Sequence, residues 1–115
     1  PFDRDIIGDT AVRFFSGFKA DIGIFGVGGI DEDGSLLDFY SGEVQARQAI
    51  TANCRSSLLV ADVSKFGRNA TVRGGHLKDC QHLFTDKPLP AAFQPIAEHY
   101  AGMIHIASDG RVRAA

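Results

Sequence analysis

The segment Asp62-Val63-Ser64-Lys65 places an acid, a hydroxyl and a cation directly after an apolar run. A lysine ammonium and a serine hydroxyl can both donate hydrogen bonds to a phosphate, and charge-assisted contacts of this kind are strong. Asp62, Ser64 and Lys65 are therefore candidate ligand-binding residues. The same pattern is equally consistent with a solvated loop at the exit of a strand.

The glycine run Gly26-Val27-Gly28-Gly29 offers a backbone that a ligand can approach closely. It follows another apolar run, and α/β folds bind ligands outside the carboxyl ends of their strands. The dinucleotide-binding fingerprint fails here, because its third glycine would fall at Asp31. We expect these glycines either to face an anion or to form a tight turn that needs positive φ.

Two further groups of charged residues have local explanations. The acidic stretch 31–34 lacks the ligand order of a calcium loop, which would need an acid at Ser35 and a glycine at Leu36, so it predicts a solvated turn. Glu43 and Arg47 are four residues apart on an expected helix. This spacing predicts a weak surface ion pair, unless that helix faces a pocket.

The cysteines and histidines predict no metal site. Cys54 and Cys80 are the only cysteines, they are far apart, and neither has a histidine pair at ligand spacing, so reduced thiols are expected. His76, His82, His99 and His105 show no HExxH-like spacing. His82 and His105 begin or interrupt expected strands and are expected to be structural. No catalytic serine or cysteine motif is present, and we expect no cofactor.

The elements that would position these residues alternate along the chain. Apolar runs at 22–27, 57–61, 82–85 and 103–107 predict buried strands, and helical spacing recurs at 44–50 and 91–100. This alternation predicts right-handed crossovers and a sheet of four parallel strands. A further short helix is expected over 10–18, and the tail 109–115 has no periodicity and is expected to be frayed.

Length and charge narrow the functional classes. The chain has 115 residues, a formal net charge of -2 and a pI of about 6.1, which predicts a single α/β domain without the basic surface that binds nucleic acid. No apolar run is long enough for a membrane span, and the start does not resemble a signal peptide, so a cytoplasmic location is expected. The sequence does not open on methionine, and we expect it to be part of a longer protein.

Taken together, the motifs resemble the C-terminal sensor domain of DeoR-family transcriptional repressors. The similarity runs over residues 6 to 107 and rests on Ile7-Gly8, Phe18-Lys19-Ala20-Asp21, Gly26-Val27-Gly28-Gly29-Ile30-Asp31, Gly34-Ser35-Leu36, Glu43-Val44, Ala49-Ile50 and Asp62-Val63-Ser64-Lys65-Phe66-Gly67-Arg68. The resemblance implies a three-layer α/β parallel-sheet fold like that of ribose-5-phosphate isomerase and glucosamine-6-phosphate deaminase. Residues 1–115 would be its C-terminal part.

The resemblance also implies a function. Family members release operator DNA when a phosphorylated sugar or polyol binds, and they contact DNA through an N-terminal helix-turn-helix that this chain does not contain. The stretches 34–37 and 64–70 are most similar to the branch that responds to glycerol 3-phosphate. A homo-oligomer with no membrane partner is implied. The implied effector-binding residues are Gly26, Gly28, Gly29, Asp31, Glu43, Arg47, Asp62, Ser64 and Lys65, with Arg47 standing where relatives usually carry lysine.

The same comparison argues against catalysis. Where the related isomerases carry paired aspartates and a general-base glutamate, this sequence offers Phe25, Gly28 and Gln48. Without carboxylates there, proton transfer between sugar carbons lacks both acid and base. Two alternatives remain open. One is a sugar-phosphate isomerase or deaminase that uses the acids at 31–33, and the other is an oligomerisation module that senses nothing.

Overall fold

The computed structural model describes residues 13, 17, 19–108 and 111–114. The helix expected over 10–18 lies almost entirely outside this part of the chain. Two helices of α type are described, α2 (Ser41–Ala52) and α3 (Gln94–His99). Three short 3-10 turns are also present, η1 (Val63–Lys65), η2 (Leu77–Asp79) and η3 (Ala91–Phe93). The strands are β1 (Ala20–Phe25), β2 (Gly29–Ile30), β3 (Ser35–Asp38), β4 (Cys54–Val60), β5 (Val72–His76), β6 (His82–Thr85), β7 (Ile104–Ser108) and β8 (Arg111–Ala114).

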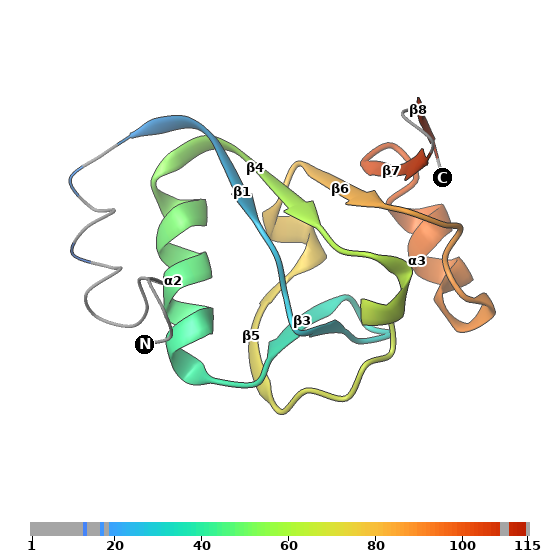
Figure 1. The fold of residues 1–115 in the computed structure, drawn as a ribbon, viewed down its shortest axis with the longest axis horizontal. Helices are drawn as coiled ribbons and strands as arrows, with labels where there is room; N and C mark the ends of the chain where they lie inside the picture. Colours follow the sequence, from blue (N-terminus) through green and yellow to red (C-terminus); the bar gives the residue numbers. More distant parts are fainter. Residues whose placement is uncertain (1–12, 14–16, 18, 109–110, 115) are drawn as a thin grey trace.

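The main sheet has five strands in the order β1-β4-β6-β7-β8 (Figure 1). The four predicted strands are confirmed, and all three pairings between them are parallel. The expectation of a frayed tail is wrong, because residues 111–114 pair antiparallel with β7 as a fifth strand. Alternation is hard to recognise in a strand of four residues that follows a turn, which is why periodicity missed it.

A second sheet, β2-β3-β5, is antiparallel and was not expected from the sequence. Its turn between β2 and β3 is the acidic stretch, and it closes at Gly34, whose φ is +90°. Gly75, with φ at +109°, supplies a second left-handed residue within β5. β2 contains only two residues and β5 carries two glycines, so neither has the composition of a predictable strand.

Helix α2 lies close against both sheets because glycine faces it from each. A Cβ added at Gly23 of β1 would lie 2.7 Å from a methyl of Ile50, and one at Gly74 of β5 would lie within 2.2 Å of Val44. Neither approach tolerates a side chain, so these glycines fix how closely the helix packs. At the N-terminus of α2, the capping position is Tyr40, whose side chain makes no capping hydrogen bond.

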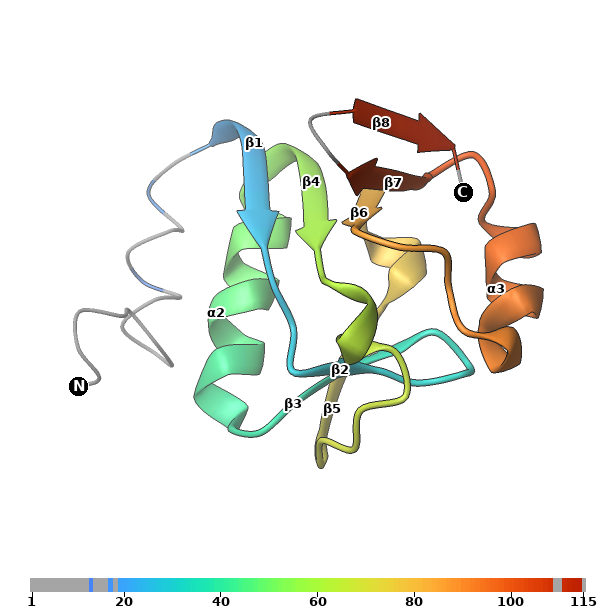
Figure 2. The ribbon, with the colours of Figure 1, turned by 45° about the vertical axis from the view of Figure 1, so that its right-hand side comes forward.

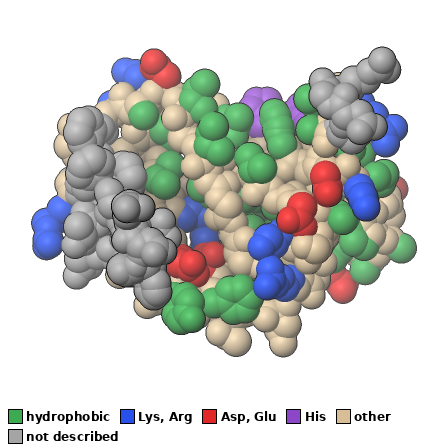
Figure 3. Space-filling view, viewed as in Figure 1, with side chains coloured by type: hydrophobic (Ala, Val, Ile, Leu, Met, Phe, Trp, Pro, Cys, Tyr) green, Lys and Arg blue, Asp and Glu red, His purple; other side chains and the backbone are tan. Residues whose placement is uncertain are grey.

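The core lies on one side of the main sheet. Phe25, Leu59, Leu83 and Ile104 point inward from four successive strands and form one cluster with Phe93 and Ile96 of the α3 region. The alternate positions face the other way, and several of these apolar side chains are more than half exposed, namely Ile22, Ile24 and Val60. Figure 3 shows hydrophobic side chains along the upper part of this view, with histidines among them. The described elements thus cover one face of the sheet.

Within the described residues, no helix is both long enough and apolar enough to cross a bilayer.

Candidate functional site

A cavity of about 420 Å³ opens at the carboxyl ends of β1 and β4. In Figure 2 the arrowheads of these two strands point toward the small sheet, and the cavity lies where the chain leaves them. This strand-end cavity is lined by Gly26, Val27, Gly28, Asp38, Phe39, Glu43, Lys65 and Arg68. Four of the sequence-predicted residues are therefore brought together here, and these are Gly26, Gly28, Glu43 and Lys65.

The two cations of the strand-end cavity lie on and just after η1. Asp62 caps this turn by accepting hydrogen bonds from the backbone N–H of Ser64 at 2.9 Å and from the Ser64 hydroxyl. These bonds lower the pKa of the Asp62 carboxyl, so it stays ionised. Lys65 ends the turn, and its ammonium has no ion-pair partner among the described residues. Asp62 and Ser64 thus hold the turn that presents Lys65.

Arg68 is the second cation, and it was not singled out from the sequence. Its guanidinium carbon lies 5.3 Å from the centroid of the Phe39 ring, within the range of a cation–π contact. It has no ion pair with a described carboxylate. The sequence could have indicated Arg68 by its position, because it follows Lys65 by three residues in the same short segment after β4. Figure 3 shows basic side chains gathered between acidic ones on this face.

The glycine run is shaped by close backbone approach. A Cβ at Gly29 would lie 2.5 Å from the carbonyl oxygen of Arg68, and one at Gly28 would lie 3.2 Å from the Leu37 carbonyl oxygen. The expectation that these glycines need positive φ is wrong, because the glycines that adopt it are Gly34, Gly67 and Gly75. Because these residues are glycines, the chain that follows β1 can lie close to both β3 and the loop that carries Arg68.

The surface pair expected between Glu43 and Arg47 does not form. Arg47 is only 4% exposed, and its guanidinium pairs with Asp38 and donates to the carbonyl oxygen of Gly74. Burial lowers the pKa of Arg47. The other oxygen of Asp38 accepts from the N–H of Gly28 at 3.0 Å. Arg47 therefore supports the wall of the strand-end cavity through Asp38.

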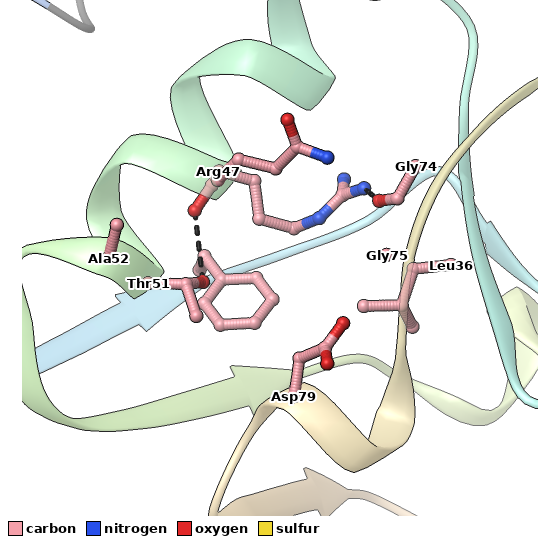
Figure 4. Close-up of a pocket in the computed structure, with 9 residues that line it drawn as sticks. Leu36, Arg47, Thr51, Ala52, Gly74, Gly75 and Asp79 are labelled. Atoms are coloured by element: carbon pink, nitrogen blue, oxygen red, sulfur yellow. Dashed lines mark hydrogen bonds between the residues drawn. The ribbon is translucent and has the colours of Figure 1, made fainter.

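A second cavity of about 300 Å³ lies beside α2, on the other side of Arg47 (Figure 4). The guanidinium of Arg47 reaches toward Gly74, while the carboxylate of Asp79 lies across the space from it. Asp79 accepts from the backbone N–H of His76 at 2.9 Å. Gln48 also lines this cavity. Phe25 forms part of its floor and belongs to the core.

The predicted acidic turn is confirmed as a turn that lies away from both cavities. Asp31 accepts a hydrogen bond from the N–H of Glu32 at 2.8 Å, and Asp33 accepts one from the N–H of Ser35 at 2.8 Å. The bond from Ser35 lowers the pKa of the Asp33 carboxyl. None of the three acids in this turn lines the strand-end cavity or the cavity beside α2.

Comparison with known proteins identifies the family. The sequence model of the DeoR C terminal sensor domain matches residues 2–87, which is most of the chain. This chain belongs to the DeoR C-terminal sensor domain family. The resemblance in the motifs is thereby confirmed.

The curated relatives of this DeoR-family chain are transcriptional regulators. It is 44% identical over 99 residues to the glycerol-3-phosphate regulon repressor of Escherichia coli, covering 85% of this chain and 39% of that protein. It is 53% identical over 83 residues to the repressor of the same name from Haemophilus influenzae, covering 72% and 32%. The HTH-type transcriptional repressor CsqR of Escherichia coli is 38% identical over 89 residues, covering 77% and 34%. The chain therefore spans between 32% and 39% of the length of these relatives.

Proposed function

We propose that this chain is the effector-sensing part of a transcriptional repressor and binds a small phosphorylated polyol, glycerol 3-phosphate, in the strand-end cavity. The observation that carries the proposal is that two cations, Lys65 and Arg68, line one cavity at the carboxyl ends of parallel strands, and neither forms an ion pair with a described carboxylate. This is the position where α/β sheets bind ligands. A phosphate is the anion that such a pair of cations suits best.

The remaining wall of the cavity suits a polyol. Glu43 lines it without an ion-pair partner among the described residues, and its carboxylate can accept hydrogen bonds from two hydroxyls. Asp38 is occupied by Arg47 and the N–H of Gly28, so it contributes structure to the wall. One end of the site is then cationic, and the other end carries a carboxylate that accepts hydrogen bonds from hydroxyl groups. The names of two of the relatives described above support glycerol 3-phosphate as the ligand.

Two of the remaining predicted residues, Arg47 and Gly29, shape the surroundings of this site without lining it, and Asp31 does not line it either. Arg47 orders Asp38, and Gly29 lets the chain pass the carbonyl of Arg68. Asp31 belongs to the turn that joins β2 to β3. In the intact repressor, binding at this cavity would weaken the hold of a separate DNA-binding region on its operator.

The test is calorimetric titration of the intact repressor with glycerol 3-phosphate, inorganic phosphate and glycerol. Lys65→Ala should weaken glycerol 3-phosphate binding about 10- to 100-fold, the loss expected for one charge-assisted hydrogen bond. Lys87→Ala, at an exposed lysine that does not line the cavity, is the matched control and should bind normally. Glu43→Gln should reduce the preference for glycerol 3-phosphate over inorganic phosphate.

The proposal is contradicted if Lys65→Ala and Lys87→Ala bind the ligand equally well. It is also contradicted if operator release by the ligand survives in Lys65→Ala at wild-type concentrations. A loss of operator binding without any ligand would instead assign Lys65 a role in folding.

We also propose that the intact protein completes a three-layer fold by covering β1 and β4. Parallel sheets are normally buried on both faces, whereas Ile22 and Ile24 are 59% and 62% exposed here. Since β1, β4, β6 and β7 follow one another in one direction across the sheet, right-handed crossovers place all their connections on the same face. An Ile24→Cys thiol should be alkylated more slowly in the intact repressor than in the 115-residue chain. Equal rates would contradict a third layer.

A further inference from the structure

Two histidine side chains meet on the exposed face of the main sheet, away from both cavities. Nδ1 of His82 on β6 lies 3.0 Å from Nε2 of His105 on β7. Their ring centroids are 5.1 Å apart, and both side chains are half-buried, so solvent reaches them. The ring centroid of Phe84 lies 4.8 Å from that of His105 and 6.3 Å from that of His82, so the three rings form one cluster.

The separation of the two nitrogens matches a chelate. A Zn²⁺ ion binds imidazole nitrogen at about 2.0–2.1 Å, so two nitrogens in adjacent coordination positions lie about 2.9–3.4 Å apart. The observed 3.0 Å falls in this range. In the pairing of β6 with β7, Phe84 lies opposite His105, so His82, two residues earlier on β6, is the diagonal neighbour of His105 on the same face of the sheet.

The protons on the two rings can be arranged so that a bound ion replaces the hydrogen bond between His82 and His105. In the structure one ring must donate a proton to the other across the 3.0 Å contact. The outer nitrogens, Nε2 of His82 and Nδ1 of His105, bond to no described residue. The bridging proton can therefore move to an outer nitrogen of the same ring by a change of tautomer. Both inner lone pairs are then free, and a turn of each ring directs them at one ion.

We propose that His82 and His105 form a binding site for a divalent transition-metal ion, such as Zn²⁺, Ni²⁺ or Cu²⁺. These are the ions that imidazole favours, whereas Mg²⁺ prefers oxygen ligands. The described residues bring no three histidine, cysteine or acidic side chains together. The ion therefore takes two protein ligands and completes its shell with water. Such an ion bridges β6 and β7. Its binding does not require a ligand in the strand-end cavity.

The test is calorimetric titration of the intact repressor with NiCl₂ and, in parallel, with MgCl₂. His82→Asn and His105→Asn should each weaken Ni²⁺ binding at least about tenfold, because each removes one of the two ligands. His99→Asn is the matched control, since His99 is exposed on α3 and contacts Tyr100. Circular dichroism of each variant verifies that it remains folded.

Binding of Ni²⁺ and not Mg²⁺ that depends on both His82 and His105 supports the site. Three outcomes overturn it: no Ni²⁺ binding by the unmodified repressor, binding that survives in both variants of the pair, or an equal loss in His99→Asn. If one variant of the pair fails to fold, the other still decides the question.

Discussion

At the scale of single residues, the buried ion pair between Arg47 and Asp38 contributes most to the geometry of the site. Both side chains are at most 5% exposed, and each has a second partner, the Gly74 carbonyl for Arg47 and the Gly28 N–H for Asp38. A buried charge pair is tolerable only when its remaining donors and acceptors are also satisfied. The sequence pattern predicted Glu43 as the partner of Arg47, because spacing along a helix reports only neighbours on that helix.

Removing Arg47 should therefore affect stability. Arg47→Ala leaves the Asp38 carboxylate buried without its cation, and the free energy of unfolding should fall by about 3–5 kcal/mol. Urea denaturation followed by circular dichroism measures the change. Glu43→Gln, at an exposed position on the same helix, should change it by less than about 0.5 kcal/mol. A loss below about 1 kcal/mol for Arg47→Ala would show that the interior tolerates the unpaired carboxylate.

The thiol of Cys80 illustrates a second effect of burial on a single residue. Burial raises its pKa from the ordinary 9.0 to about 11, with a smaller contribution from the nearby charge of Asp79. The folded state thus favours the protonated thiol. This contribution to stability is complete below pH 9 and is lost as the pH rises toward 11.

We accordingly expect Cys80 to resist alkylation in the native state. In a Cys54→Ser background, iodoacetamide at pH 8 should modify Cys80 at least about 100-fold more slowly in the folded chain than in urea, since two pKa units reduce the thiolate fraction by that factor. Mass spectrometry of quenched samples gives both rates. Similar rates in the two states would mean that the thiol is neither buried nor shifted.

At the scale of elements, the sequence predicts what regular patterns encode. Four parallel strands and both helices were recoverable because each is an apolar run or a helical repeat long enough to show a period. The small antiparallel sheet was not recoverable, because β2 has two residues and β5 is held by pairing with β3. Four predicted site residues line the strand-end cavity, whereas Arg68 and Asp38 enter it only through tertiary folding.

The packing of β2 against the Arg68 loop gives a prediction for this element. Gly29→Ala places a methyl 2.5 Å from the Arg68 carbonyl oxygen, so the loop must shift. We expect a loss of about 1–3 kcal/mol in unfolding free energy, the usual cost of overpacking. Gly102→Ala, where nothing lies within 4 Å, is the control and should be close to neutral. Thermal denaturation of both variants would decide, and equal melting temperatures would contradict the close approach.

At the scale of the whole molecule, two cavities flank the buried Arg47, and neither brings two unpaired carboxylates together to act as acid and base. The strand-end cavity has Glu43, but at the strand end itself Phe25 is in the core and Gly28 carries no side chain. In the cavity beside α2, Gln48 is uncharged, and the carboxylate of Asp79 accepts a hydrogen bond from the N–H of His76. Asp33 has a lowered pKa and lies on a turn outside both cavities, so it is a poor general acid.

This arrangement predicts binding without turnover. The intact protein should convert neither ribose 5-phosphate nor glucosamine 6-phosphate above the rate of buffer alone, even where one of them raises its melting temperature. General acid and base groups typically supply 10²- to 10⁴-fold each, so their presence would be easy to detect in a coupled assay. Turnover that disappears in Asp31→Asn would restore the enzyme as the better interpretation.

The position of β1 at the end of the main sheet affects how the isolated chain behaves at high concentration. Its outer edge presents unpaired backbone N–H and C=O groups among the described residues, and its exposed face carries Ile22 and Ile24. Natural sheets usually protect such an edge with charge, proline or a covering segment, because a bare apolar edge is a template for strand addition. Here a single exposed ion pair, Asp21 with Arg55 at 2.8 Å, stands near the start of the strand. Ile22→Lys would place a charge within the strand and keep concentrated solutions of the 115-residue chain free of edge-to-edge aggregation.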